Sequence, residues 1–300
     1  MENQQLPSME GFGSYLQEYV RASTIKVYTQ DVKTFIHRQG EVKVYQAVYQ
    51  DILNYVDYLR KCKQTAPVIS RQIASLKQFY SYLISVEYRE HHPCKTLYLK
   101  DNKTKSVQLQ NLFSTTELER LMERKERFTQ LVTVKNKVLT SLLIYQALRL
   151  REFNDIKLSD IDLEKGTITI RRIARCKTRT LPLKSHQVML FYKYIYEIRP
   201  KLLALSKQPT DHFLLNIRGY PESGMGVHNL IDTKRHYFPD RKLTTVTIRQ
   251  SVIANYLKEG KDIRVVQEFA GHSSLVTTEK YRENNLNELQ NIIQKYHPLA

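Results

Sequence analysis

The chain has 300 residues, a formal net charge of +17 and a pI of about 9.6. Hydrophobic residues make up 41% of the sequence, which is enough for sizeable cores, and the length suits one large domain or two ordinary ones. The positive charge favours a polyanionic partner, nucleic acid before an anionic membrane surface, over a basic protein with no such partner.

Cysteine usage and the start of the chain narrow the class of protein. The three cysteines are Cys62, Cys94 and Cys176. Because they are odd in number, widely spaced and without a CxxC pair, they argue against a disulfide framework and against a zinc site. Residues 1–13 lack the pattern of a signal peptide, and no apolar run approaches the roughly 18 residues of a membrane span. We therefore expect a soluble, cytoplasmic protein that holds no metal.

Residues 13–99 have the apolar spacing of helices. In one of these segments Ser23 is placed to cap a helix N-terminus, and Gly40 ends the run. Lysines and arginines lie between the apolar positions. The pattern predicts a small bundle of four or five helices, with one face in the core and another electropositive. The apolar stripes are Ile25, Tyr28, Val32, Phe35 and Ile36; Ile52, Tyr55, Val56 and Leu59; and Ile69, Ile73, Leu76, Phe79, Tyr80 and Leu83.

A polar stretch follows the helical half. The text KDNKTKSVQLQN, which ends at residue 111, contains three lysines and little apolar content, so we expect a linker. The expected domains are residues 1–100 and 112–300, joined by 101–111. If the linker crosses DNA, Lys103 and Lys105 neutralise phosphates; otherwise it is an ordinary basic tether.

The second domain begins and ends with helical patterns. Ser114 and Glu117 fit a capping box before an amphipathic helix. The mostly apolar run VLTSLLIYQAL, residues 138–148, predicts a central, buried helix. Helical periodicity returns over 186–204 and 244–300.

Two β-like runs lie between these helices. GTITI, residues 166–170, alternates with period two, and TRTLPL, residues 178–183, supplies a second run. They predict a hairpin or a three-stranded sheet beside the helices. The expected fold class is therefore mainly α with a small β-sheet.

The segment ALRLREF, directly after the buried helix, is the first candidate for chemistry. It places Arg149 three residues before Glu152, so that both would lie on one face of a helix. A carboxylate in that position orients a guanidinium group. The alternative is an ordinary surface ion pair.

The second candidate is the cationic run RRIARCKTRT, residues 171–180, between the two β-like runs. A hairpin tip rich in cations can enter a DNA groove or contact phosphates. Lys177 could also donate a proton, whereas phosphate contact alone would account for every charge. The arginines expected to bind DNA are Arg171, Arg172, Arg175 and Arg179.

The last candidates lie near the C-terminus. Arg249 lies inside a helical run, and VVQEFAGH reads as a helix that ends at Gly271 and is followed by His272. Tyr281 comes nine residues after that histidine. Taken alone, Tyr281 fits a core position as well as a nucleophile, since the chain has 20 tyrosines.

Together these segments resemble the tyrosine recombinase or phage integrase family, in particular its Xer-like bacterial branch. ALRLREFNDIKLSDID is similar to the family's first arginine box, and IRQSVIANYLKEGKDIRVVQEFAGHSSLVTTEKY to its second, which is highly specific. The resemblance covers essentially the whole chain. It implies a helical, SAM-like core-binding domain followed by an α+β catalytic domain. The weaker N-terminal pattern T...Y..D...F is met by Thr24, Tyr28, Asp31 and Phe35.

The resemblance implies DNA strand cleavage and rejoining without a metal or other cofactor. The family's tyrosine, here Tyr281, attacks a phosphodiester and leaves a 3′-phosphotyrosyl link and a free 5′-hydroxyl, a step that can be reversed. Guanidinium groups suit the charge that develops on the phosphate oxygens. In the implied roles Arg149 and Arg249 clamp the phosphate, Lys177 protonates the leaving oxygen, His272 holds the phosphate or assists proton movement, and Glu152 positions its neighbours.

The chain departs from the family pattern at two positions. The family usually has histidine or lysine three residues before its second arginine, where this chain has Val246. One lost charge-assisted hydrogen bond costs about 1.5–3 kcal/mol, or about ten- to a hundredfold in rate. His236 or a nearby threonine is a candidate substitute. The family's hairpin lysine also lies somewhat earlier than Lys177, so Arg175 is the alternative to it.

The resemblance also implies partners. These are double-stranded DNA and a homotetramer on DNA, with a dimer on each site; the participation of an accessory DNA-bending protein stays open. A short apolar stripe after Tyr281 either packs on its own domain or docks on a neighbouring protomer. It consists of Leu286, Leu289, Ile292 and Ile293.

Three functions are weighed on this sequence. The favoured one is a site-specific recombinase that integrates, excises or inverts DNA. The second is a catalytically weakened relative that binds DNA as an architectural or regulatory protein, which Val246 motivates. The third is a type IB-like topoisomerase, which shares the chemistry but acts alone. Formation of a covalent protein–DNA adduct distinguishes the recombinase from the weakened DNA-binding relative. Strand exchange between two marked duplexes distinguishes the recombinase from the topoisomerase.

Overall fold

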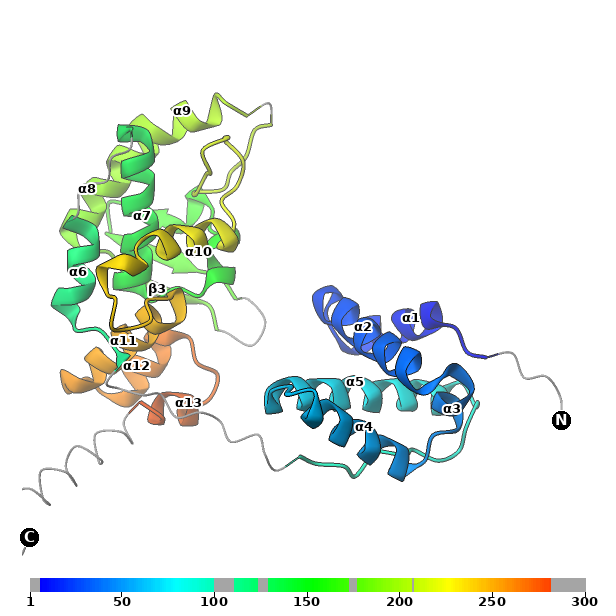
Figure 1. Cartoon of the computed structure of the whole chain (residues 1–300). Coiled ribbons are helices and arrows are strands. Elements are labelled where there is room, and N and C mark those ends of the chain that lie inside the picture. Colours follow the sequence, from blue (N-terminus) through cyan, green and yellow to red (C-terminus); the bar gives the residue numbers. More distant parts are fainter. Residues whose placement is uncertain (1–5, 100–110, 124–128, 173–176, 207, 282–300) are drawn as a thin grey trace, which may run out of the picture. The chain divides into compact units, whose positions relative to one another are not determined.

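Contacts between Cα atoms divide the chain into two compact units, unit 1 (Met1–Lys105) and unit 2 (Ser106–Ala300). Among the described residues, every helix is too short or too polar to traverse a bilayer. The computed structural model describes residues 6–99, 111–123, 129–172, 177–206 and 208–281 (Figure 1).

Over residues 6–99, the described part of unit 1, all regular secondary structure is helical, and the core contains the predicted apolar stripes. All three apolar stripes lie in or against a single hydrophobic cluster. The expected cap at Ser23 is wrong, since the second helix begins at Ala22 after Arg21. Gly40 ends that helix at φ 87°, a conformation that favours glycine. The helices are α1 (Met9–Tyr19), α2 (Ala22–Gln39), α3 (Glu41–Gln46), α4 (Tyr49–Lys61) and α5 (Ala66–Ser85).

A buried polar group joins two helices of unit 1. Asp31 on α2 is 6% exposed and accepts hydrogen bonds from the Arg71 Nη1 atom at 2.7 and 2.8 Å and from the Ser75 hydroxyl at 2.7 Å. We call these three residues the Asp31 group. The buried carboxylate is thus paired with one cation, which is itself partly exposed.

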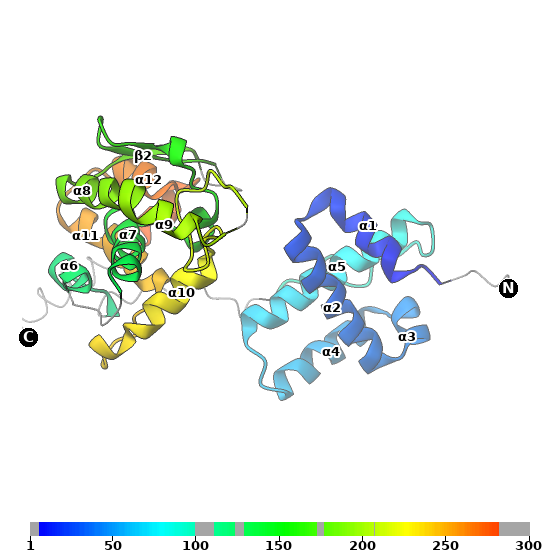
Figure 2. The same cartoon turned by 90° about the horizontal axis from the view of Figure 1, so that it is seen from above.

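Unit 2 is built around one buried helix, α7 (Gln130–Gln146). Residues 138–148 are all buried, as predicted, and Figures 1 and 2 show α7 among the other helices of unit 2. The Ser114–Glu117 capping box is also confirmed, because each residue's side chain accepts from the other's backbone N–H. The other helices are α6 (Thr115–Glu123), α8 (Ser185–Lys193), α9 (Arg199–Leu203), α10 (Gly224–Thr233), α11 (Thr245–Lys258), α12 (Ile263–Ala270) and α13 (Leu275–Glu279).

A small antiparallel sheet of order β1-β2-β3 completes unit 2. It consists of β1 (Ile161–Asp162), β2 (Thr167–Ile170) and β3 (Arg179–Pro182). Alternate residues of the hairpin face the core, so Arg179 and Leu181 of β3 are buried while Thr180 is exposed. The predicted fold class, mainly helical with a small sheet, is confirmed.

Candidate active site

Arg149 lies where the chain leaves the central helix. The helix α7 ends with Ala147 in the left-handed conformation, and Arg149 is extended before a 3₁₀ turn, not on a helix. Glu152 accepts a hydrogen bond from the Arg149 backbone N–H at 2.8 Å and from its Nη1 at 3.2 Å. Because the Glu152 side chain is only 1% exposed, this is not the surface pair that the sequence left open.

Arg249 reaches the same place from α11. This helix begins at a Thr244 cap and carries Arg249 on its buried side. The Arg249 guanidinium donates to the carbonyl groups of Ala147 and Ala270, and Arg149 Nη1 donates to the same Ala270 oxygen at 3.2 Å. Burial, followed by the charge of Arg149, lowers the pKa of Arg249 to about 10. Two guanidinium groups therefore converge on one point, an arrangement that suits an anion.

His272 follows the turn that ends α12. Gly271 adopts the left-handed conformation at φ 61°, as predicted for this helix end. The His272 Nε2 lies 3.3 Å from Arg249 Nη2, and Nδ1 lies 2.9 Å from the buried Thr278 hydroxyl. Burial, followed by the charges of Arg249 and Arg149, lowers the pKa of His272 to about 3, so the ring is neutral at pH 7.

Tyr281 lies two residues after the end of α13, beside this histidine. The two rings are nearly parallel, with centroids 6.5 Å apart. Burial raises the pKa of Tyr281, while Arg249, a side-chain hydrogen bond with Gln250 and Arg149 oppose that rise. The phenol is therefore protonated at neutral pH, within reach of the cations that would stabilise its ionised form.

The cationic hairpin divides into one buried and several exposed side chains. Arg179, predicted to bind DNA, is 4% exposed and donates to both Glu152 oxygens, at 2.9 and 3.0 Å. That prediction is wrong for Arg179, because its guanidinium is enclosed in an ion pair. Arg171 and Arg172 are exposed, and Arg171 Nε lies 2.7 Å from Asp160. Arg175, Lys103 and Lys105 lie outside the described residues.

Lys177 and His272 line one cavity. The cavity has a volume of about 390 Å³ and lies between the start of β3 and the end of α12, with Arg264 and Gln267 on its α12 side. The Lys177 side chain is exposed. The structure thus places the predicted lysine on the same cavity as the predicted histidine.

Residues 111–288 match the phage integrase family, and residues 9–87 match the SAM-like N-terminal domain of phage integrases. The chain belongs to the phage integrase family. It is 30% identical to the tyrosine recombinase XerC of Oceanobacillus iheyensis over 97% of this chain and 96% of that protein. It is 26% identical to XerD of Listeria monocytogenes, over 93% and 94% of the two chains.

Solved structures share the fold of this integrase-family chain at low identity. XerH bound to a palindromic difH substrate, a post-cleavage complex, matches with a TM-score of 0.72 and 17% identity over 98% of this chain and 91% of that one. The Tn1549 transposon integrase in complex with transposon right end DNA matches with a TM-score of 0.68 and 16% identity, over 95% and 98%.

Two polar residues of the site were missed from the sequence. Thr278 holds the ring of His272, and Gln250 interacts with the hydroxyl of Tyr281. Both lie inside the second box quoted from the sequence, where Thr278 comes three residues before Tyr281 and Gln250 directly follows Arg249. Polar side chains next to reactive groups are too common in helices for such spacing to predict a role.

Val246 leaves one position of the family pattern without a polar group. It lies in the first turn of α11, one helical turn before Arg249, with 61% of the residue exposed. His236, the proposed substitute, lies in the 3₁₀ turn Arg235–Tyr237, where its ring contacts Tyr237. Valine can pack against DNA but donates no hydrogen bond to a phosphate.

Proposed function

We propose that this tyrosine-type site-specific recombinase cleaves DNA through Tyr281. The observation that carries the proposal is the meeting of Arg149, Arg249 and His272 around the Ala270 carbonyl, with the Tyr281 ring alongside. The two guanidinium groups are held by backbone oxygens and by a carboxylate that Arg179 shares. Because one carboxylate does not neutralise three arginines, the guanidinium groups of Arg149 and Arg249 retain net positive charge. A phosphodiester fits that charge and geometry.

The reaction follows from the chemistry of these groups. The Tyr281 oxygen forms a bond to phosphorus as the bond to the 5′-oxygen breaks, so the chain holds a 3′-phosphotyrosine. Arg149 and Arg249 bind the non-bridging oxygens on which charge develops. Neutral His272, with a free-protein pKa of about 3, binds the phosphate or assists transfer of the phenolic proton.

The leaving group needs a proton as well. Lys177, on the cavity shared with His272, supplies it to the 5′-oxygen, and Arg175 is the alternative donor. Because phosphorus stays in an ester bond throughout, a 5′-hydroxyl from a second duplex can attack the adduct and rejoin the strand. No outside energy source is required for this exchange.

We also propose how the protein assembles on DNA. Residues 1–100 and 112–300 form the two DNA-holding domains, with Lys103 and Lys105 of the 101–111 linker on phosphates. Exchange between two duplexes needs four active sites, so we propose a homotetramer with a dimer on each site, acting in the cytoplasm. XerH and the Tn1549 integrase, whose folds this chain shares, were solved bound to DNA.

The test begins by finding the substrate. The protein is incubated with sheared DNA of its own genome, and fragments that stay attached under denaturing conditions are sequenced. A nicked duplex carrying the recovered sequence then traps the adduct, because the short cleaved strand diffuses away. We expect an adduct with the wild-type chain and none with Tyr281→Phe.

Tyr256→Phe is the matched control, since Tyr256 is another partly buried tyrosine of unit 2, packed against Phe269. It should form the adduct as the wild type does. An adduct that survives in Tyr281→Phe would contradict the proposal. Exchange between two marked duplexes, beyond relaxation of one, separates a recombinase from a topoisomerase.

A further inference from the structure

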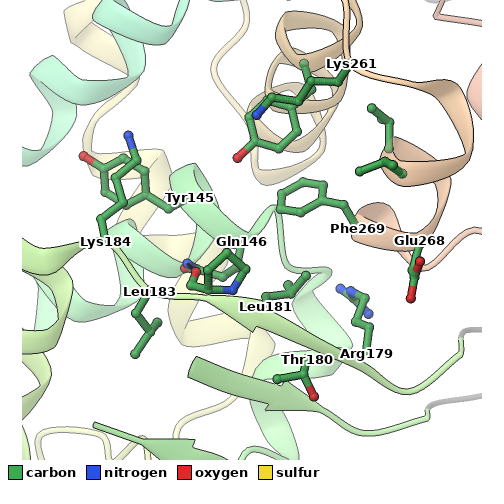
Figure 3. Close-up of a pocket in the computed structure, with 14 residues that line it drawn as sticks. Tyr145, Gln146, Arg179, Thr180, Leu181, Leu183, Lys184, Lys261, Glu268 and Phe269 are labelled. Atoms are coloured by element: carbon green, nitrogen blue, oxygen red, sulfur yellow. Dashed lines mark hydrogen bonds between the residues drawn. The ribbon is translucent and has the colours of Figure 1, made fainter. Parts of the chain in front are cut away.

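One buried arginine of the site takes no part in the reaction above. Arg179 is the first residue of β3, where it shares the inward face with Leu181. Its side chain is 2% exposed, and Figure 3 shows it on the opposite side of the strand from Thr180. Its Nη1 and Nη2 donate to the two oxygens of Glu152 at 2.9 and 3.0 Å, which is a bidentate pair.

Glu152 is shared between two arginines, and the sharing is unequal. The backbone N–H of Arg149 donates to one Glu152 oxygen, and its guanidinium makes a single, longer hydrogen bond of 3.2 Å to the other. Its guanidinium also donates to the carbonyls of Ala270 and Gly271. Burial is the largest single influence and favours the neutral form of Glu152, but the hydrogen bonds and charges of Arg179 and then Arg149 together keep the pKa of Glu152 below its ordinary value, with Arg179 the larger of the two. Arg179 is therefore the main counter-charge of this carboxylate.

Arg179 also contacts the turn that carries His272. A Cβ atom on Gly271 would lie 2.8 Å from Arg179 Nη1, so the guanidinium packs directly on the glycine backbone. Lys177 comes two residues before Arg179 in the same hairpin. One enclosed side chain thus joins the Arg149 turn, the His272 turn and the strand that leads from Lys177.

From this geometry we propose that Arg179 is a positioning residue that keeps the Arg149 guanidinium free for the scissile phosphate. The proposal rests on the proposed function and deepens it. Without Arg179, Arg149 is the remaining ion-pair partner of Glu152 among the residues that the structure describes. Arg149 then turns its paired N–H groups onto the carboxylate, and its charge is neutralised before DNA arrives. Arg179 prevents this by occupying both carboxylate oxygens.

Two substitutions and their combination test the proposal. Arg179→Gln should lower the rate of adduct formation at saturating DNA by about ten- to a hundredfold, the value of one charge-assisted contact to the phosphate. Its DNA affinity should change little. Adding Glu152→Gln removes the carboxylate that captures Arg149, so the double variant should react faster than Arg179→Gln alone. Arg179→Lys, which keeps the charge but not the bidentate contact, should lie between Arg179→Gln and the wild type.

Other roles give other results. A purely structural role predicts that the double variant is as slow as Arg179→Gln or slower, and that outcome overturns the proposal. Direct phosphate contact predicts weaker binding and a salt dependence reduced by about one phosphate charge, which overturns it as well. Lys165→Gln, which removes an exposed charge in the turn between β1 and β2, is the control for net charge and should match the wild type within about twofold.

A measurement without DNA separates this proposal from the proposed function. The guanidinium NMR signal of Arg149 should shift in Arg179→Gln, as its N–H groups bind Glu152, and return toward the wild-type position in the double variant. An unchanged signal in Arg179→Gln contradicts the positioning role even if the wild type cleaves DNA. A wild type that forms no adduct, with the expected NMR shifts, counts against the function and not against the role of Arg179.

Discussion

The Asp31 group of unit 1 and the arginine cluster of unit 2 are both built around a buried carboxylate. We define the arginine cluster as Arg149, Arg179 and Arg249 with Glu152. Asp31 meets one arginine and a serine hydroxyl. Glu152 accepts hydrogen bonds from two arginines, Arg149 and Arg179. The third arginine, Arg249, lies nearby, and its burial and the charge of Arg149 lower its pKa to about 10.

The difference shows how the same interaction serves stability in one unit and ligand binding in the other. In the Asp31 group the charges cancel, so its contacts hold α2 against α5. In the arginine cluster positive charge exceeds negative charge, which costs folding free energy in the free protein and is offset when an anion binds. Each prediction below changes one of these sites and asks whether stability or cleavage responds.

The largest effect is expected from Arg249→Lys. Lysine cannot reproduce the planar donor pair, so adduct formation at saturating DNA should fall by about 10²–10³-fold. The free energy of unfolding should change by less than the activation free energy of cleavage, because moving the positive charge relieves its repulsion from Arg149. Single-turnover cleavage and chemical denaturation measure the two effects.

Arg199→Lys is the matched control for that change. Arg199 is also buried in unit 2, but it donates to the carbonyls of Thr210 and His212 and lies outside the candidate site. It should lose stability and keep the saturated cleavage rate. If both lysine variants cleave at the same rate, the distinction between the two kinds of buried arginine is wrong.

Asp31→Asn should have the next largest effect, on stability alone. It leaves Arg71 without its carboxylate, and we expect unit 1 to lose about 1–3 kcal/mol, toward the lower end because Arg71 is 39% exposed. Asp57→Asn, in the exposed pair with Arg60, should cost no more than about 0.5 kcal/mol. Urea denaturation followed by circular dichroism measures both. Equal losses would show that the Asp31 group adds nothing beyond a surface pair.

Val246→His should add a phosphate contact and raise the cleavage rate by up to about tenfold. The position is exposed and lies one helical turn before Arg249. Met225→His is the control, since Met225 is also an exposed apolar residue in the first turn of a helix. A rate that stays the same or falls in Val246→His would mean that this position does not face the phosphate.

The last prediction concerns the pH dependence of stability. The folded pKa of His272, about 3, lies below its ordinary value of 6.5, so the unfolded chain binds the proton first as the pH falls. His272 therefore destabilises the fold progressively below pH 6.5, by up to about 1.4 kcal/mol per pH unit. His272→Gln should flatten the fall in melting temperature between pH 6.5 and 4.5. Parallel slopes in the wild type and His272→Gln would contradict a buried, neutral His272.

Much of the fold and the site follows from local pattern in the sequence. The apolar run 138–148 predicted the central helix, and Gly40 and Gly271 marked helix ends because they take positive φ values there. The resemblance picked out Arg149, Arg249, His272 and Tyr281, and the structure brings them together. Their proposed roles remain to be tested by the experiments above.

Long-range pairing was harder to predict. Arg179 was assigned to DNA because it ends a cationic run, and nothing local indicates that Glu152, 27 residues earlier, is its partner. One local signal was available: Arg179 lies two positions before the apolar Leu181, so in a strand both face inward. Ser23 failed as a cap for a different reason. The helix begins one residue before Ser23, after an extended Arg21 whose side chain makes no capping hydrogen bond, and a shift of a residue or two at a helix end leaves the apolar pattern unchanged.

The central claim is that the hydroxyl oxygen of Tyr281 becomes covalently bonded to the 3′-phosphate of a cleaved DNA strand. Trapped adduct can be digested with nuclease and protease, and the modified peptide identified by mass spectrometry. The chain has 20 tyrosines, and we predict a nucleotide 3′-phosphate on the peptide that contains Tyr281 and on no other tyrosine. A nucleotide on a different tyrosine or on a serine, with the Tyr281 peptide unmodified, would contradict the account.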